Sequence, residues 1–154
     1  MDQIIVDDFK DVNDLDSNSY ILFMYDSFGN IRNMENINQF ESHFDIIKLE
    51  GEIKNKINKY KFKTLQNRNY LPISTSLLVN YQTYNILYVP IMWIKQDISN
   101  TRNYYNSLMS VLIHIYKIRL LTENTQVTKL YIVNNNLNQI ENTLEDFKKL
   151  ENIY

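Results

Sequence analysis

Apolar runs and polar breaks divide the chain into strands and helices. Tyr20 to Tyr25 form a continuous apolar run of strand-forming residues, which is typical of a strand buried on both faces. The segment Asp26 to Asn30 follows, and its Gly-Asn pair predicts a turn. Nearer the amino end, Gln3 to Val6 predict a short strand and Asp7 to Asp16 an acidic loop.

The middle of the chain predicts an amphipathic helix followed by a hairpin. Leu71-Pro72 ends the helical pattern, and Ser74 to Val79 and Tyr84 to Val89 then predict two strands. The connection from Asn80 to Thr83 is short enough for a hairpin. The apolar face of the helix consists of residues at helical spacing: Ile46, Leu49, Ile53, Ile57 and Tyr60.

The strongest helical pattern follows a loop from Pro90 to Ser99 that has Trp93 at its centre. Asn100 or Thr101 can cap this helix, which runs to Leu121. Its predicted core face comprises Tyr104, Leu108, Val111, Leu112, Ile115 and Ile118. After it, Lys129 to Val133 predict a strand, an Asn cluster predicts a turn, and a final helix is marked by Ile140, Leu144, Phe147 and Leu150 or Ile153.

The predicted order of elements is therefore β, β, α, β, β, α, β, α. Buried strands separated by amphipathic helices indicate a three-layer α/β/α sandwich with a mixed central sheet. The length of 154 residues suits one domain over residues 1–154, since no linker or internal repeat divides the chain.

The amino-acid composition excludes several classes of protein and of functional site. A net charge of −2 argues against a general binder of polyanions, so a nucleic-acid partner is not expected. The absence of Cys excludes a disulfide scaffold, a thiolate zinc site and a cysteine nucleophile. The chain has 22 Asn and 20 Ile but no Ala, which indicates an AT-rich genome. Large DNA viruses of protists, some protists and some endosymbionts have such genomes, and a large DNA virus is the favoured source.

No targeting segment is expected. The start, Met1-Asp2-Gln3, lacks the basic and apolar regions of a signal peptide. The longest apolar stretch, Ile86 to Ile94, contains a proline and is far shorter than the roughly 20 residues of a membrane span. We expect an intracellular protein in the cytoplasm, or in a virion, without a membrane partner.

One segment carries a family resemblance. An apolar strand from Tyr84 runs into Pro90 and Met92, a short loop follows, and a long helix begins near Asn103. This pattern resembles the macro-domain-like family found in viruses and phages, as does the first strand with its acidic end, Ile4 to Asp7. The chain departs from the family at Ile91, where Thr is usual, and at Lys95, where a second Pro is common.

The resemblance implies an ADP-ribose site with a carboxylate at the adenine, an Asn near the distal ribose and glycine-rich loops around the diphosphate. Asp7, with Asp8, could contact an adenine, although a solvated acidic loop is the favoured interpretation. Asp26 with Asn30 could face a ribose, although a turn with self-bonded side chains is favoured. The candidate ligand-binding residues are Asp7, Asp26, Gly29, Asn30, Pro90, Met92, Trp93, Asn103 and Asn134.

The same loops lack the expected glycines. Gly29 is the one glycine after the second strand, Asn134 to Asn136 replace a glycine loop, and Arg32 is the only nearby cation. Because a diphosphate needs converging backbone N–H groups or cations, we expect weak ADP-ribose affinity. Neither a catalytic residue, a cofactor nor a metal site is expected. His114 is interpreted as a satisfied core or boundary histidine.

Three functions follow from these observations. The leading hypothesis is a degenerate macro-domain-like protein that acts as a non-catalytic binding or structural subunit, through a protein partner or self-assembly. The first alternative is a nucleotide- or ADP-ribose-binding macro domain, with or without hydrolase activity. The second is a weak RNA-binding module that uses Lys54 to Lys63 with Tyr60 and Phe62, for which a solvated lysine-rich helix face is the default interpretation.

Overall fold

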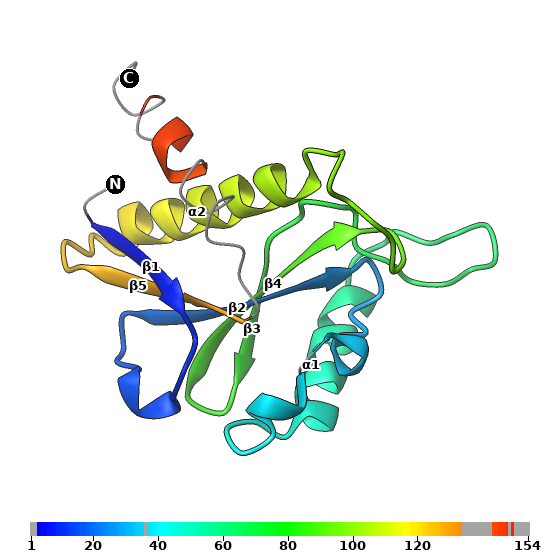
Figure 1. Ribbon diagram of the computed structural model, residues 1–154, viewed down its shortest axis with the longest axis horizontal. Coiled ribbons are helices and arrows are strands. Elements are labelled where there is room, and N and C mark those ends of the chain that lie inside the picture. The colour runs from blue at the N-terminus through cyan, green and yellow to red at the C-terminus, as the bar shows by residue number, and fades with distance from the viewer. Residues whose placement is uncertain (1–2, 36, 134–142, 148, 150–154) are drawn as a thin grey trace.

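The computed structural model describes residues 3–35, 37–133, 143–147 and 149 and shows an α/β protein (Figure 1). Its five strands form one mixed sheet in the order β1-β5-β2-β4-β3, in which only β3 runs antiparallel to its neighbour. The strands are β1 Ile4–Asp8, β2 Ser19–Asp26, β3 Leu77–Tyr81, β4 Tyr84–Met92 and β5 Thr128–Ile132.

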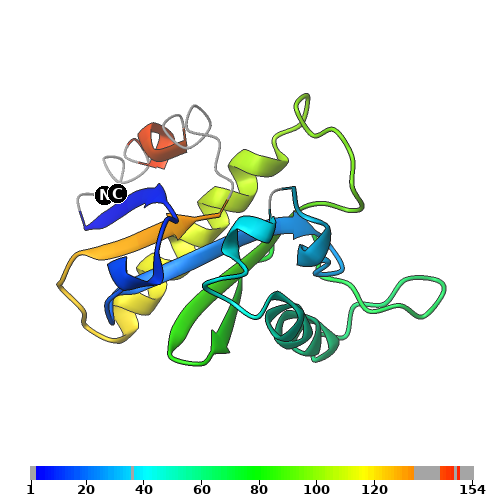
Figure 2. The same cartoon turned by 60° about the horizontal axis from the view of Figure 1, so that its bottom comes forward.

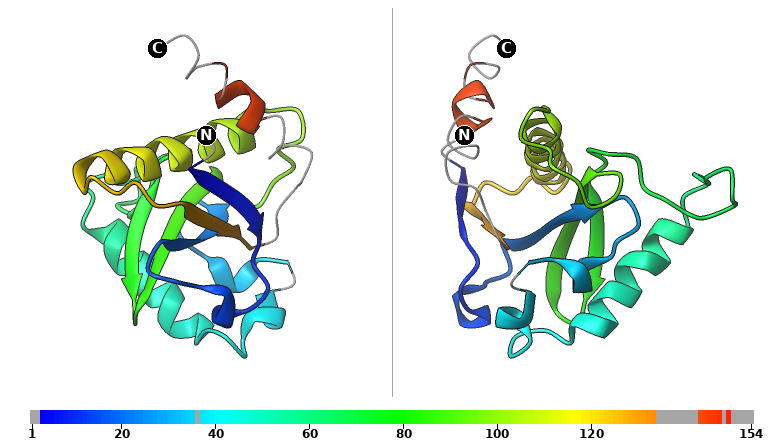
Figure 3. Two further views of the ribbon diagram at one scale, coloured as in Figure 1. Left: turned by 90° about the vertical axis from the view of Figure 1, so that its left-hand side faces the viewer. Right: turned by 45° about the vertical axis from the view of Figure 1, so that its right-hand side comes forward.

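Helices lie on both faces of the sheet (Figure 3). Helix α1 (Ile46–Asn58) packs on one face and α2 (Asn103–Leu121) on the other. Three short 3-10 turns, Val12–Asp14, Ile31–Asn33 and Ile37–Phe40, lie outside the two helices. Residues 143–147 are also helical, and the remaining apolar positions of the predicted final helix lie outside the described residues.

The apolar run of β2 divides between two cores. Successive strand side chains point to opposite faces, so Ile21 and Phe23 pack with α1 while Leu22 and Met24 pack with α2. The prediction of a strand buried on both faces is confirmed. Successive side chains of β4 also alternate between the two cores. Strand β2 is the middle strand of the sheet, and β4 pairs beside it.

Helix α1 buries the predicted apolar stripe with one exception. Asp45 caps the helix by accepting a hydrogen bond from the Lys48 backbone N–H at 3.2 Å. Tyr60, assigned to the stripe from its spacing, lies beyond the end of the helix at Asn58 and is exposed. The stripe therefore ends at Ile57, and Tyr60 belongs to the surface.

Helix α2 begins later than predicted. Its first residue is Asn103, and Arg102 occupies the N-cap position without a side-chain cap bond. The hydroxyl of Thr101 instead accepts a hydrogen bond from the Asn103 backbone N–H at 3.2 Å. The predicted core face is buried apart from Ile118, and buried Ser107, Met109 and Arg119 extend it.

Several strand boundaries differ from the predictions, and β3 spans Leu77–Tyr81 rather than Ser74 to Val79. Asp7 and Asp8 belong to β1 rather than to a loop, because they pair with Tyr131 and Ile132 of β5. The hairpin between β3 and β4 turns over two residues, 82–83, instead of four. Pro90 to Met92 continue β4 rather than starting a loop, since β2 runs on beside them.

Strand β5 lies between β1 and β2, and a buried arginine supports this insertion. The Arg119 guanidinium donates hydrogen bonds to the Gln126 carbonyl, to Thr128 Oγ1 at 2.6 Å and to Gln3 Oε1 at 2.9 Å. It thereby joins the end of α2 to the starts of β1 and β5.

Within the part of the chain that the structure describes, no helix combines the length and apolar character needed to cross a membrane.

Candidate functional site

The carboxyl ends of β2 and β4 bring most of the predicted site residues together. Asp26 at the end of β2 pairs with Met92 at the end of β4. Ligand crevices in open α/β sheets form at such carboxyl ends. Asn103 begins α2 one turn before Ser107, whose hydroxyl donates to the Pro90 carbonyl at 3.1 Å. The residues gathered in this region are Asp26, Gly29, Asn30, Pro90, Met92, Trp93 and Asn103.

The carboxylate of Asp26 is used within its own loop. Its Oδ1 accepts the backbone N–H groups of Phe28 at 3.0 Å and Asn30 at 3.1 Å, and Oδ2 accepts the Asn30 Nδ2 group at 2.7 Å. Asp26 is buried, so these donors replace its lost hydration. The self-bonded turn favoured by the sequence is confirmed, because all three of these donors belong to the loop after β2.

Gly29 is required by the packing of the loop against α1. Its φ of +75° is a left-handed conformation that glycine adopts without steric cost. A Cβ atom built at this position would lie 3.0 Å from Ile53 Cγ2 and 3.0 Å from Ile57 Cδ1. The space that the missing side chain leaves is therefore filled by the helix rather than open to a phosphate.

Asp7 lies away from this region. Its carboxylate is exposed and accepts the Asp8 backbone N–H at 2.8 Å. Asp7 pairs with Tyr131, which pairs with Ile21 of β2, five residues before Asp26. At about 3.3 Å per residue, this register places Asp7 roughly 16 Å along the sheet from Asp26 and two strands aside. Asn134 lies outside the described residues.

A chain of aromatic rings runs outward from buried Phe28 through Trp93. Neighbouring rings have centroids 5.0 to 6.4 Å apart, and most contacts are tilted or edge-on. Phe28 at the inner end is buried, whereas Tyr60, Phe62 and Trp93 are 37 to 43% exposed. We call this set the aromatic row, in the order Phe28, Trp93, Tyr70, Phe62 and Tyr60.

A cavity of about 300 Å³ adjoins the inner end of the aromatic row. The guanidinium of Arg68 lies over the Phe28 ring, 3.7 Å from its centroid. Arg32, predicted to be the only nearby cation, is engaged elsewhere, because its Nε donates to Glu50 Oε1 at 3.0 Å. The cavity is lined by Phe28, Lys54, Ile57, Asn58, Asn67, Arg68 and Asn69.

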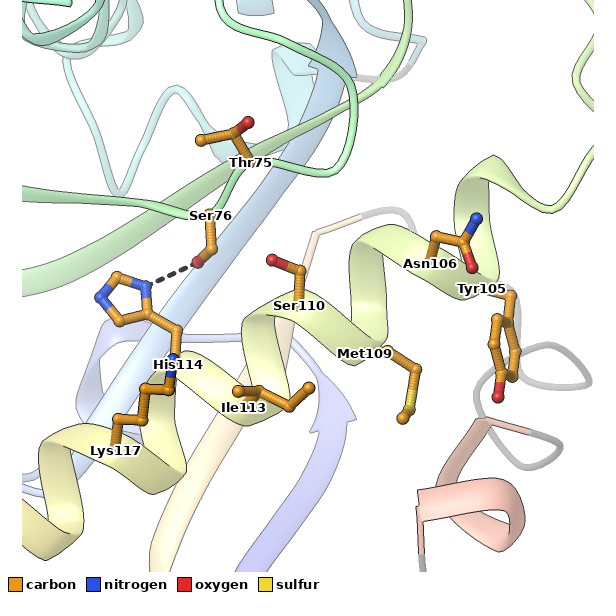
Figure 4. Close-up of a pocket in the computed structure, with 9 residues that line it drawn as sticks. All are labelled: Thr75, Ser76, Tyr105, Asn106, Met109, Ser110, Ile113, His114 and Lys117. Atoms are coloured by element: carbon orange, nitrogen blue, oxygen red, sulfur yellow. Dashed lines mark hydrogen bonds between the residues drawn. The ribbon is translucent and has the colours of Figure 1, made fainter. Parts of the chain in front are cut away.

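A second hollow, of about 550 Å³, follows α2 beside the start of β3 (Figure 4). In it, His114 Nδ1 lies 2.8 Å from Ser76 Oγ, within hydrogen-bond distance. Burial, with the nearby charge of Lys117, lowers the pKa of His114 below its ordinary value of 6.5. His114 is thus a boundary histidine with a partner, as predicted.

The Ser76–His114 pair lacks the third group of a nucleophilic triad. Such a base is normally oriented by a further group, most often a carboxylate. Among the described residues, no acidic side chain forms an ion pair with His114. The same residues contain no group of three or more His, Asp or Glu side chains that could hold a metal ion.

We call the region at the carboxyl ends of β2 and β4 the carboxyl-end site. Sequence reasoning missed three of its members: Phe28, Arg68 and Tyr70. These side chains meet Trp93 or one another only through tertiary contacts. A charge signal was available, because no acidic residue occurs between Glu52 and Asp97.

Comparison with known proteins finds no family model and no curated protein that matches this chain. The assignment of function therefore depends on the geometry of the site.

Proposed function

We propose that this chain is a non-catalytic binding protein with a macro-domain-like fold, and that it holds its ligand at the carboxyl ends of β2 and β4. The observation that carries the proposal is the closed loop after β2. In this loop, residues 27–30, three donor groups form hydrogen bonds to the Asp26 carboxylate, and Gly29 packs against α1. The loop that would hold a ribose and diphosphate is occupied by its own side chains.

The macro-domain-like part of the proposal is supported by the path of the chain around β4. Pro90 and Met92 end a central strand, and the chain then returns through a loop to Asn103 at the start of α2. This is the sequence of features on which the resemblance depends. Ile91 and Lys95 remain departures from the family pattern.

Binding without catalysis is supported by the chemistry of the carboxyl-end site. A hydrolase needs an activated nucleophile or a positioned general base. Asp26 already accepts three hydrogen bonds from its own loop, and His114 lies in the separate hollow beside the start of β3. What the site does present is exposed ring surface on Trp93 and the cation of Arg68.

Calorimetric titration with ADP-ribose tests this proposal against the enzyme alternative. We expect a dissociation constant above about 100 μM, which corresponds to a binding free energy of less than roughly 5.5 kcal/mol. No release of ADP-ribose from modified substrates should occur. Saturable low-micromolar binding that is lost in Asp26→Ala, while that variant still melts cooperatively, would establish an ADP-ribose site instead.

A further inference from the structure

The small net charge conceals a strong asymmetry along the chain. Residues 53–96 contain seven basic side chains and no acidic one. The remainder holds the other nine basic residues and all 18 acidic residues. A clustered basic segment is the electrostatic signature of a surface for polyanions, even when the whole protein is slightly acidic. The net charge of −2 averages over this asymmetry.

Part of this basic segment forms a projecting hairpin after α1 (Figure 2). We call residues 62–70 the 62–70 hairpin. Thr64 N donates to the Arg68 carbonyl at 2.8 Å, and Tyr70 N donates to the Phe62 carbonyl at 3.2 Å, which closes the two arms. Its turn uses Asn67 at a φ of +64°. The basic side chains on or beside this hairpin are exposed: Lys59, Lys61, Lys63, Arg68 and Lys95.

The aromatic row connects this hairpin to the carboxyl end of β4. Phe62 and Tyr70 come from the two arms of the hairpin, and Trp93 follows β4. Tyr60, Phe62 and Trp93 leave more than a third of their surface exposed. Exposed rings offer stacking platforms to unpaired bases, whereas the bases of a duplex are already stacked on one another.

A hydrogen bond between two asparagines links the hairpin to the end of α1. Asn69 Nδ2 donates to Asn58 Oδ1 at 2.8 Å, and both residues line the cavity under the hairpin. Among the described residues, Asn69 Oδ1 is one of two buried side-chain polar atoms that have no hydrogen-bond partner. Because this oxygen is buried, it belongs to the packing of the hairpin and is not presented to a bound base.

We propose that the aromatic row and the 62–70 hairpin bind single-stranded nucleic acid. Bases stack on the exposed rings of Tyr60, Phe62 and Trp93, while Lys61 and Lys63 neutralise phosphates. This inference rests on the proposed function, since it names the ligand of the same carboxyl-end site. It replaces the default interpretation of a solvated lysine-rich helix face, because Tyr60 and Phe62 lie outside α1 on the surface.

Trp93 is the only tryptophan of the chain, so its fluorescence reports directly from the row. The probes are a 12-nucleotide oligo(U), a 12-nucleotide oligo(dT), a 12-base-pair duplex, and vesicles containing phosphatidylserine. We expect both single strands to quench Trp93 saturably and the duplex to bind at least tenfold more weakly. Comparison of the two single strands shows whether RNA or DNA is preferred.

Two kinds of variant separate stacking from charge. Phe62→Ala should weaken oligo(U) binding about tenfold, since a base loses its stacking platform. Its matched control is Tyr105→Ala, which removes a ring with a guanidinium neighbour, Arg102, from the first turn of α2. Lys61→Ala and Lys63→Ala should each reduce the slope of log affinity against log salt by about 0.7, whereas Lys10→Ala should not.

The outcomes separate this inference from the proposed function. Failure of both oligonucleotides to bind, equal affinity for the duplex, or an unchanged affinity in Phe62→Ala would overturn the nucleic-acid inference alone. Stronger Trp93 quenching by the vesicles would also overturn it, in favour of a membrane surface. Low-micromolar ADP-ribose binding that depends on Asp26 would overturn the proposed function, whatever the oligonucleotides do.

Discussion

The hydroxyl group of Tyr88 on β4 donates a hydrogen bond of 2.5 Å to the backbone carbonyl oxygen of Asp26 at the end of β2. Tyr88 is completely buried. Burial first, and then the nearby charge of Asp26, raise the pKa of Tyr88 well above its ordinary value of 10.0. The bond ties the two central strands together at the residue where the closed loop begins.

Replacing Tyr88 by Phe removes this bond and leaves the Asp26 carbonyl without its buried donor. We expect Tyr88→Phe to lower the free energy of unfolding by about 1–2 kcal/mol in urea denaturation. Tyr20→Phe, which changes a half-buried tyrosine at the other end of β2, serves as the control and should change stability less.

The same tyrosine makes stability depend on alkaline pH. Its pKa is higher in the folded than in the unfolded state, so the stabilisation is fully present below about pH 10 and declines as the pH rises toward the folded-state pKa. Thermal melting of the wild type should therefore fall more steeply above pH 10 than that of Tyr88→Phe. Parallel curves for the two proteins would contradict this assignment.

The two glycines of the chain should respond oppositely to alanine. Gly29→Ala places a Cβ in contact with α1 at a positive φ, and we expect it to destabilise the protein by about 1–3 kcal/mol. Gly51 lies in α1 with nothing within 4 Å of a new Cβ. Gly51→Ala should therefore stabilise by about 0.5–1 kcal/mol. A Gly29→Ala variant as stable as the wild type would show that the loop is not held against the helix.

Adjacent residues of α2 provide a test of the core that it covers. Leu112 is fully buried against the sheet, whereas Ile113 is 40% exposed. Leu112→Asp places an unpaired charge in that core and should abolish cooperative melting, since a domain of this size is stable by only about 5–15 kcal/mol. Ile113→Asp should melt cooperatively near the wild-type temperature. Thermal melting of both variants, followed by circular dichroism, tests whether Leu112 faces the core and Ile113 faces the solvent.

His114 should make stability depend on mildly acidic pH. Its pKa is lower in the folded than in the unfolded state, so the stabilisation is complete above about pH 6.5 and is lost as the pH falls below that value. We expect the wild type to lose more stability between pH 7 and pH 5 than His114→Gln. Titration of the imidazole by NMR should give a pKa below 6.5, and a value above 6.5 would contradict the burial assigned to this side chain.

The elements were predictable where one physical signal dominated. The run from Tyr20 to Tyr25 is apolar on both faces, and the spacing of Leu49 and Ile53 fits one face of a helix, so their assignments are confirmed. Boundaries set by pairing were not predictable. Asp8 is polar yet belongs to β1, and Pro90 belongs to β4, because a neighbouring strand continues beside each.

The site was only partly predictable for a related reason. The sequence placed Trp93 after a central strand and favoured a self-bonded turn at Asp26, and both placements are confirmed. The sequence shows no link between Phe28 and Trp93, which are 65 positions apart, or between Tyr70 and Trp93. Such contacts arise only when the sheet brings the ends of β2 and β4 together.

The position of β5 between β1 and β2 also fixes when the sheet can be completed during synthesis. The one described partner of β1 is β5, which begins 120 residues after β1 ends. At about 5–20 residues per second, a ribosome needs roughly 6–24 s to cover that distance. The strands β2, β3 and β4 can pair before then, while β1 waits with its backbone groups unpaired. Pairing of β1 with β5 is therefore among the last steps of folding.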